Sequence, residues 1–404
     1  MRYTIGELAE IIDGDRGKNY PQQSEFMAEG YCLFLNTGNV TTSGFSFESN
    51  QFITKEKSDL LRKGKLRRRD IVYTTRGTVG NAGFFSESVP YEHIRINSGM
   101  VIIRPNESVV CTEFLYQILK SSYYRPYFQQ YCTGSAQPQL PIKNLSKIEL
   151  DIPALERQYQ IANILSAYDT LIENNQKQIK LLEEAAQRLY KEWFVDLRFP
   201  GHETTSIVNG VPVGWVDRKF SDVVSIMSGG TPKTDNKEYY DGSIPFYTPK
   251  DSDGAFFAFD TITHISQSGL EHCNSRLYPA GTVIITARGT VGKTTILAVP
   301  MAMNQSCYAL KYDDLNSPYY LFFALNREVE KLKTMANGGV FNTIIVKTFE
   351  QISLMVPPKD VLESFEVVVS PFMEQIKSRM RQIELLRETR DRLLPKLMNG
   401  EIEV

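Results

Sequence analysis

Two stretches of this chain place apolar residues at alternating steps of four and three, the pattern of a helix that packs along a second helix. The first stretch covers residues 161–193 and the second residues 365–397. Their equal length and register favour pairing with each other. The residues that we expect at this pairing are Ile161, Leu165, Tyr168, Ile172, Ile179, Leu182, Leu189 and Trp193 in the first helix, and Phe365, Val369, Phe372, Ile376, Ile383, Leu386, Leu393 and Leu397 in the second.

The side chains along the two stretches favour an antiparallel pair. A register that sets Trp193 against Phe365 also sets Tyr168 against Arg390, which brings a cation to an aromatic ring. It also combines small with large side chains across the pair. We therefore predict an antiparallel coiled coil.

Pro371 and Pro395 interrupt the second stretch. A parallel pair would bring Arg379 beside Asn175, which disfavours that orientation. Pro371 fits the start of a helix better than its middle, so we expect the second helix to begin near this residue or to kink there.

The chain contains an internal sequence repeat. Residues 76–80 and residues 288–292 are both Arg-Gly-Thr-Val-Gly, and each copy follows a β-branched run that indicates a strand ending in a tight turn. Pro153 corresponds to Pro357 and Gln178 to Gln382, both at a spacing of 204 residues, whereas Ile5 corresponds to Phe220 at a spacing of 215. The globular parts therefore differ by insertions and deletions, and the helical parts keep a fixed length.

The repeat predicts mixed α/β domains that alternate with long helices. Short strands such as residues 70–75 and 282–286 are followed in each half by a helical pattern, at residues 113–120 and 319–333. We expect a first domain at 1–153, a first helical spacer at 154–198, a second domain at 199–357 and a second helical segment at 358–404.

Composition restricts the class of protein. The chain has 404 residues, 42% of them hydrophobic, with a formal net charge of −2, so bulk charge does not indicate a nucleic-acid partner. No stretch approaches the roughly 20 apolar residues of a membrane span. The five cysteines are scattered and never form a CxxC pair, which argues against a disulfide framework and a zinc site. We expect a cytoplasmic protein without a membrane segment. The basic run at residues 63–69 suits a solvated face and a DNA contact about equally.

The chain offers little catalytic chemistry. Residues 287–294 satisfy a relaxed phosphate-loop pattern, but the apolar run that follows indicates a strand, whereas a phosphate loop opens a helix. The first copy of the loop has Asn81 and Ala82 where a phosphate loop needs lysine and threonine. The four histidines are not at metal-ligand spacing. A phosphate-loop NTPase is therefore the weakest alternative, and a coiled-coil scaffold without a nucleic-acid role is the other. We expect no catalytic residue and no metal site.

Several segments together resemble the conserved regions of type I restriction-modification specificity subunits. They are residues 187–201 (QRLYKEWFVDLRFPG), residues 392–401 (RLLPKLMNGE), and residues 134–139 and 153–158 at the exit from the first domain. The resemblance covers the whole chain. The second half departs from it at residues 338–342, where the glutamine-bearing exit segment is not repeated, so a role for Gln137 has no counterpart there.

This resemblance implies a non-catalytic subunit whose two target-recognition domains each read one half of a split, asymmetric DNA site. The helices would space the domains and dock two methyltransferase subunits and, in the full enzyme, restriction subunits. S-adenosylmethionine, ATP and magnesium would belong to those partners, and this chain would hold no cofactor. The residues that we expect at double-stranded DNA are Arg76, Thr78 and Gln137 in the first half and Arg288, Thr290 and Lys293 in the second. Pairing of each arginine with a nearby carboxylate is the competing interpretation.

Overall fold

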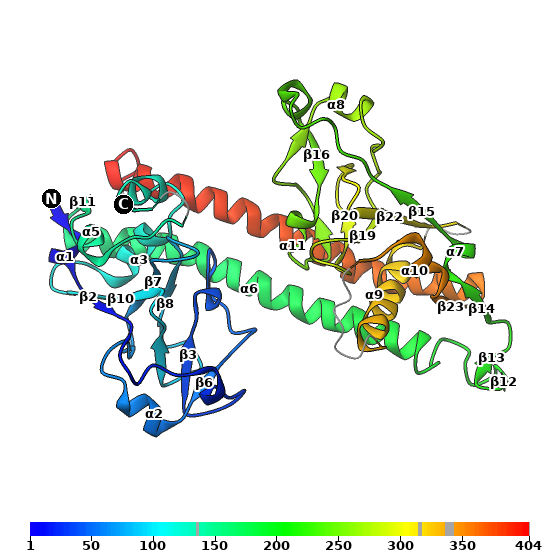
Figure 1. Cartoon of the computed structure of the whole chain (residues 1–404), viewed down its shortest axis with the longest axis horizontal. Coiled ribbons are helices and arrows are strands. Elements are labelled where there is room, and N and C mark those ends of the chain that lie inside the picture. The colour runs from blue at the N-terminus through cyan, green and yellow to red at the C-terminus, as the bar shows by residue number, and fades with distance from the viewer. Residues whose placement is uncertain (135–136, 314–316, 336–342, 404) are drawn as a thin grey trace. The chain divides into compact units, whose positions relative to one another are not determined.

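A computed structural model describes residues 1–134, 137–313, 317–335 and 343–403 of the chain. It divides into two compact units, unit 1 with residues 1–173 and 384–404 and unit 2 with residues 174–383. The two long helices α6 (Leu155–Phe194) and α11 (Lys359–Asn399) each supply a segment to both units (Figure 1). The units therefore divide within these helices, whereas the domains expected from the sequence end before them.

Unit 1 is a mixed α/β structure. Its strands are β1 (Arg2–Thr4), β2 (Ala9–Asp13), β3 (Cys32–Leu35), β4 (Val40–Thr41), β5 (Gly44–Phe45), β6 (Phe52–Ile53), β7 (Ile71–Thr74), β8 (Ala82–Phe84), β9 (Ile94–Ile96), β10 (Met100–Pro105) and β11 (Glu149–Asp151). Its shorter helices are α1 (Ile5–Leu8), α2 (Lys55–Leu60), α3 (Thr112–Lys120), α4 (Arg125–Gln129) and α5 (Ile142–Leu145), with 3-10 turns η1 (Gln23–Glu25) and η2 (Thr37–Asn39).

Unit 2 has the same character. Its strands are β12 (Ile207–Val208), β13 (Val211–Pro212), β14 (Val216–Lys219), β15 (Val224–Ser228), β16 (Ile244–Tyr247), β17 (Phe257–Ala258), β18 (His264–Ile265), β19 (Val283–Thr286), β20 (Thr294–Leu297), β21 (Ala302–Met303), β22 (Cys307–Tyr312) and β23 (Ser353–Val356). Its shorter helices are α7 (Phe220–Val223), α8 (Gln267–Glu271), α9 (Pro318–Met335) and α10 (Val346–Glu350), with 3-10 turns η3 (Lys237–Tyr240) and η4 (Pro249–Asp251).

The sheets of the two units have the same topology. The central sheet has the order β2-β10-β7-β8 in unit 1 and β15-β22-β19-β20 in unit 2, where β17 adds a fifth strand. A second sheet has the order β6-β3-β9 in unit 1 and β18-β16-β21 in unit 2, with one antiparallel and one parallel pairing in each. The pair β1–β11 matches the pair β14–β23. The predicted repeat of mixed α/β domains is therefore confirmed at the level of strand order.

Strand β7 shows why these runs form a central strand. Its four residues are all buried, so both of its faces are covered. Ile71 and Tyr73 pack with α3 in one hydrophobic cluster, and Val72 packs on the other face with residues of the second sheet. Strand β19 repeats this division, because Val283 and Ile285 lie in the cluster of α9 and Ile284 lies in another. Runs of β-branched residues suit a strand that is buried on both sides.

The long helices run antiparallel within each unit, as predicted. In unit 1, the guanidinium of Arg157 donates to the carbonyl of Leu397 at 3.2 Å. In unit 2, the rings of Trp193 and Phe365 lie 5.7 Å apart. In each unit, the apolar positions of the two heptad patterns therefore lie where α6 and α11 contact each other.

The prediction that the second helix begins near Pro371 is wrong. Helix α11 begins at Lys359 and continues through Pro371 and Pro395. Proline removes the hydrogen bond to the carbonyl four residues earlier, which here is that of Val367. Val367 is 73% exposed, so solvent can satisfy the carbonyl that loses its partner.

Candidate nucleic-acid interface

The two copies of Arg-Gly-Thr-Val-Gly form the connecting loops of matching hairpins. Loop 1 is residues 76–80 between β7 and β8, and loop 2 is residues 288–292 between β19 and β20. In loop 1, the amide of Thr74 donates to Asn81 O at 2.9 Å, and the amide of Gly80 donates to Thr74 O at 3.1 Å. The amide of Asn81 donates to the hydroxyl of Thr74 at 2.9 Å, and this hydroxyl donates to the carbonyl of Thr78.

Loop 2 repeats this network atom for atom. The amide of Thr286 donates to Lys293 O at 2.9 Å, and the amide of Gly292 donates to Thr286 O at 2.9 Å. The amide of Lys293 donates to the hydroxyl of Thr286 at 3.0 Å. The hydroxyl of Thr286 in turn donates to the carbonyl of Thr290. The last threonine of the strand therefore holds the loop closed in both units.

The second residue of each loop needs glycine for a backbone reason. Gly77 has a φ of 72° and Gly289 a φ of 81°, in the left-handed region that side-chain-bearing residues rarely adopt. This reversal leaves the preceding arginine at the outer edge of the hairpin.

Each unit exposes its loop arginine. Arg76 and Arg288 are exposed, and neither guanidinium has a hydrogen-bond or ion-pair partner in the part of the chain that the structure describes. The competing interpretation is that each arginine stabilises its turn by pairing with a carboxylate. No carboxylate among the described residues makes such a pair. Thr78, Thr290 and Lys293 are exposed as well, and the hydroxyl of Thr290 donates to the carbonyl of Pro249 at 3.1 Å.

A second cation lies against the last glycine of each loop. In unit 1 it is Arg125 of α4, whose Nη2 donates to the carbonyl of Gly80 at 3.2 Å. In unit 2 it is Lys333 of α9, whose Nζ lies 3.7 Å from the point where a Cβ on Gly292 would be, and which also pairs with Glu330 at 2.7 Å. The two cations come from the helical segments that follow the matching strands β10 and β22, so a positive charge lies beside both loops.

The predicted residue Gln137 lies in an exposed turn close to loop 1. Thr133 and Gln139 close that turn with hydrogen bonds of 2.7 and 2.9 Å, and the amide of Leu140 donates to Thr75 O at 3.0 Å, next to Arg76. In unit 2, the amide of Ile344 donates to Ala287 O at 2.9 Å. The exit segment thus joins the base of the loop in both units. Ser135, Ala136 and residues 338–342 of these segments lie outside the described residues.

The basic run at residues 63–69 is partly structural. The guanidinium of Arg68 donates to the carbonyls of Ser86 at 2.6 Å and Val89 at 3.0 Å, and lies 4.2 Å from the centre of the Phe85 ring. Arg69 pairs with Glu113 at 2.8 Å and also with Glu107. These two arginines hold their own domain together, while Lys63, Lys65 and Arg67 are exposed.

The structure places the expected helix-pairing residues on the inner faces of α6 and α11. Those that are buried are Ile161, Leu165, Ile172, Trp193, Phe365, Val369, Ile376, Ile383 and Leu397, and those that are partly buried are Tyr168, Ile179, Leu182, Leu189, Phe372, Leu386 and Leu393. Arg390, expected against the Tyr168 ring, instead ion-pairs with the carboxylate of Asp169 at 2.8 Å.

The contact between Asn175 and Arg379 also differs from expectation. We associated it with a parallel pair, yet Arg379 Nη1 donates to Asn175 Oδ1 at 3.3 Å in the antiparallel pair of unit 2. The two residues are 204 positions apart and so are equivalent in the repeat. At the centre of an antiparallel pair, equivalent residues meet each other in this orientation too.

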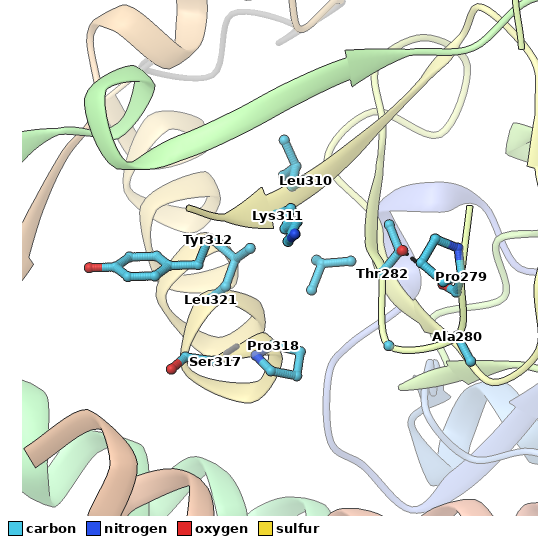
Figure 2. A pocket seen from close by; sticks show the side chains of 11 residues that line it. Pro279, Ala280, Thr282, Leu310, Lys311, Tyr312, Ser317, Pro318 and Leu321 are labelled. Carbon is cyan, nitrogen blue, oxygen red and sulfur yellow. Dashed lines mark hydrogen bonds between the residues drawn. The ribbon is translucent and has the colours of Figure 1, made fainter. Parts of the chain in front are cut away.

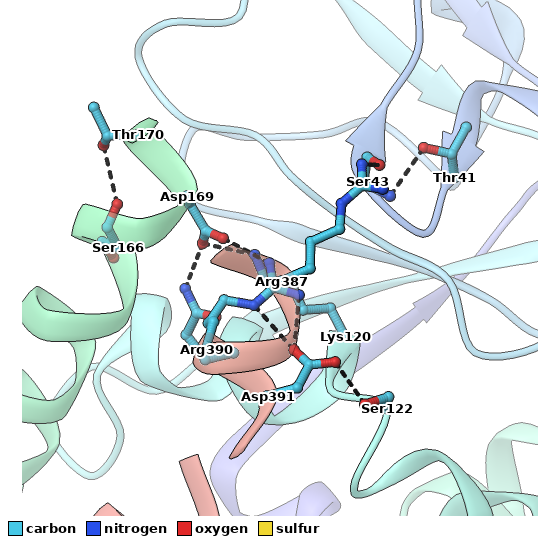
Figure 3. A network of polar contacts seen from close by, with 11 residues as sticks. Thr41, Ser43, Lys120, Ser122, Ser166, Asp169, Thr170, Arg387, Arg390 and Asp391 are labelled. Carbon is cyan, nitrogen blue, oxygen red and sulfur yellow. Dashed lines mark hydrogen bonds and ion pairs between the residues drawn. The ribbon is translucent and has the colours of Figure 1, made fainter. Parts of the chain in front are cut away.

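A buried charged cluster in unit 1 was not predicted from the sequence (Figure 3). Asp169 of α6 pairs with Nζ of Lys120 on α3 at 2.6 Å and with Arg390 of α11 at 2.8 Å. Asp391 accepts from Ser122, and Arg387 donates to Ser43 Oγ at 2.6 Å. Both long helices are thereby tied to the globular part of unit 1.

Burial and charge act on the pKa values of this cluster in opposite directions. Burial lowers the pKa of Lys120 to about 8, despite the carboxylate beside it. Burial also works to raise the pKa of Asp169, but the positive charges of Lys120 and Arg390 outweigh it and hold that pKa below its ordinary value. The ionised carboxylate is thus the centre of the cluster.

The contact between the long helices and the globular part of unit 2 is aromatic, at positions that the 204-residue repeat makes equivalent to Ile161, Leu394 and Leu397 of unit 1. The fully buried ring of Phe365 lies 4.8 Å from Phe194 and 5.7 Å from Trp193. Tyr190 and Tyr320 complete the cluster, and the amide of Tyr320 donates to the Glu366 carboxylate at 2.9 Å. Burial raises the pKa of Glu366 to about 7, although that hydrogen bond opposes the shift.

A small cavity in unit 2 lies away from loop 2 (Figure 2). It is bordered by the residues that precede and begin β19, by the end of β22 and by the start of α9, with Pro279, Thr282, Lys311 and Leu321 among its lining. Arg288 follows the opposite end of β19. The cavity is therefore separate from the candidate interface.

Two further observations limit the chemistry. Strand β20 follows loop 2, so loop 2 does not open a helix as a phosphate loop must. Over the described ranges, no group of three or more His, Cys, Asp or Glu could hold a metal ion.

Among the described residues, no helix combines the length and apolar character that crossing a membrane requires.

Comparison with known proteins identifies a consistent set of relatives. The model of the type I restriction modification DNA specificity domain matches residues 1–184 and again residues 212–382. The specificity subunit of the type I restriction enzyme HindI from Haemophilus influenzae is 25% identical over 98% of this chain and 100% of its own length. The specificity subunit of the type I restriction enzyme MjaIX from Methanocaldococcus jannaschii is 27% identical over 83% of this chain and 78% of its own length.

A solved structure supports the same fold. The S subunit of a type I restriction-modification system from M. genitalium matches with a TM-score of 0.56 at 16% identity, over 98% of this chain and 96% of that one. At this identity the likeness establishes the fold.

Proposed function

The chain belongs to the type I restriction modification DNA specificity family, and on that premise we propose that each of its two globular domains reads one half of a split DNA site. The protein is a specificity subunit of a type I restriction-modification enzyme, the component that recognises DNA. The observation that carries the proposal is the duplication itself: one chain holds two domains of the same topology, each with an exposed Arg-Gly-Thr-Val-Gly hairpin.

Differences between the domains support separate half-sites. The central sheet is shared, but unit 2 adds β17 to it, while unit 1 has the hairpin β4–β5. Loops that vary on a constant frame are the usual way in which one fold recognises different ligands. Two domains of one chain would thus read two different short base sequences.

The helix pair is proposed to set the gap between the half-sites and to dock the other subunits. We propose two methyltransferase subunits and, in the full enzyme, restriction subunits as partners. We further propose that this chain is non-catalytic, that S-adenosylmethionine, ATP and magnesium are held by those partners, and that the complex works in the cytoplasm, where DNA is accessible.

Mapping of methylated sites tests the proposal. Cells would express the chain with its cognate methyltransferase subunit, and the methylated motif would be read from their DNA. Replacement of residues 209–350 by the matching region of a relative should change one half-site and leave the other half and the gap unchanged. A change in both half-sites would contradict the assignment of one domain to each half.

A second variant tests the spacing role. Insertion of one heptad after Glu173, together with a heptad at the facing position of α11, adds about 10 Å to the paired helices. Both half-sites should persist, and the gap should lengthen. A complex that assembles with the same gap would contradict the spacing role. A complex that shows no salt-sensitive binding of duplex DNA would favour the scaffold alternative.

A further inference from the structure

We propose that loops 1 and 2 bind the phosphodiester backbone of DNA, not its bases, and so position each domain on the duplex without taking part in sequence discrimination. This inference rests on the proposed function. It assigns Arg76 and Arg288 as positioning residues and leaves the reading of bases to the parts of each domain that differ between the halves.

The first argument comes from identity across the repeat. The two domains share little sequence and would read different half-sites, yet residues 76–80 and 288–292 are identical and their hydrogen-bond networks agree. A segment that discriminates between bases must differ where the bases differ. An identical segment in two different readers suits a ligand that is the same at both half-sites, and the phosphodiester backbone is such a ligand.

The second argument comes from the chemistry of the loops. Both arginines are exposed without a described partner, and a second cation, Arg125 or Lys333, lies against the last glycine of its loop. The amides of Gly77, Thr78 and Val79 have no acceptor among the described residues, and neither do those of Gly289 and Thr290. Successive amides next to a left-handed residue, with cations beside them, form a concave site for an anion.

A protein partner that is present in two identical copies would also suit two identical loops. The charges favour the phosphate, because arginine, lysine and unpaired amides are all donors and an anion satisfies them together. Backbone contacts of this kind position a protein on DNA and carry no sequence information.

The experiment uses the chain assembled with its methyltransferase subunits. Binding of Arg76→Ala and Arg288→Ala complexes would be measured on a duplex with the mapped motif and on a duplex without it, over a series of salt concentrations. Each variant should weaken binding to both duplexes by the same factor, and lower the slope of log affinity against log salt by about 0.9, the value for one phosphate contact. The methylated motif and the gap should not change.

Three further variants make the result specific. Arg76→Lys should recover most of the affinity, because a phosphate accepts a point charge whereas bidentate pairing with guanine needs the guanidinium fork. Arg2→Ala and Arg218→Ala remove one exposed arginine from the matching strands β1 and β14, outside the loops, and should leave the salt slope unchanged.

Several outcomes would overturn the inference. A motif that relaxes at one position in Arg76→Ala, with no rescue by Arg76→Lys, would show base reading. Loss of a methyltransferase subunit from the complex would show a protein contact. An equal loss of slope in Arg2→Ala or Arg218→Ala would show general electrostatics. Failure of the proposed function is a distinct result, since the wild-type complex would then give no motif.

Discussion

The two units contact the same helix pair through clusters of different chemistry, and these clusters lie at different positions of the repeat. Unit 1 uses charge, with Asp169 between Lys120 and Arg390. In unit 2 the contact is aromatic, because the Phe365 ring packs among Tyr190, Trp193 and Phe194. At the positions equivalent to Asp169 and Arg390, unit 2 has the buried apolar residues Met373 and Ala186, so the charged cluster is not repeated.

This difference has energetic consequences. An aromatic cluster stabilises in proportion to the area that it buries, and each ring contributes separately. A buried charged cluster is stable only as a complete set, because removal of one member leaves the others buried without a partner. The two clusters should therefore respond differently to the loss of a single side chain.

The largest effect is expected from Phe365→Ala. The ring is fully buried, and removal of such a ring costs about 3–5 kcal/mol. Both tryptophans of the chain, Trp193 and Trp215, lie in unit 2 and are buried, so their fluorescence during urea unfolding reports on this unit. Phe259→Ala, at a partly buried position of unit 2, is the control and should cost clearly less. An equal loss of stability in both variants would show that the Phe365 ring contributes no more than a partly buried ring does.

A somewhat smaller effect is expected from Asp169→Ala in unit 1. It leaves Lys120 buried without its carboxylate, whereas Arg390 keeps its ion pair with Asp391 at 2.8 Å, so the cost is about 2–4 kcal/mol, below the value for a fully buried pair. Hydrogen exchange should increase in α3 and the adjoining part of α6 and stay unchanged in unit 2.

The same experiment has an internal control. Asp59→Ala breaks the exposed pair with Lys55 and should change exchange very little. The double variant Asp169→Ala with Lys120→Met should recover part of the loss, since it removes the unpaired charge. If the double variant is less protected than Asp169→Ala, the cluster is not a charge-balanced set.

The third prediction concerns pH and unit 2. Because burial raises the pKa of Glu366 to about 7 from 4.5, the folded state favours the protonated carboxyl. Its stabilising contribution is complete below pH 4.5 and is lost as the pH rises through 7. Unit 2 should therefore lose about 2 kcal/mol between pH 5.5 and 8. Tryptophan fluorescence measured in urea at both pH values checks this.

Glu366→Gln should remove most of that pH dependence, whereas Glu363→Gln, at an exposed position one turn earlier, should retain it. An unchanged pH dependence in Glu366→Gln would assign the titration to another group.

The smallest effect is expected from Arg379→Met at the centre of the helix pair. The Nε of Arg379 is buried without a partner, and its Nη1 makes one bond to Asn175, so an apolar side chain of similar length should change the stability of unit 2 by less than about 1 kcal/mol. The urea midpoint followed by tryptophan fluorescence measures this. A loss of more than about 2 kcal/mol would show that the Asn175 bond outweighs the unpaired nitrogen.

The sequence predicted features whose signal is local. The heptad seams placed Trp193 against Phe365, and the repeat placed both Arg-Gly-Thr-Val-Gly loops at the ends of matching strands, because periodicity and turn residues act over a few positions. The exposure of Arg76 and Arg288 followed from the glycine that comes after each.

The charged cluster of unit 1 was not predictable in this way. Asp169, Lys120 and Arg390 are far apart in sequence, and each alone is indistinguishable from a solvated charge. Pro371 was misjudged for a related reason. Whether a proline is tolerated within a helix depends on the exposure of the carbonyl four residues earlier, which only the folded chain defines.

Unit 1 is assembled from two separate stretches of chain, and this affects its biosynthesis. Residues 384–403 are translated after all of unit 2, which is one continuous stretch of chain. Until then, the apolar face formed by Ile161 and Leu165 lacks its partners Leu394 and Leu397. The domain that is translated first therefore completes its core only with the last residues of the chain, and a prematurely terminated chain exposes this face to chaperones and proteases.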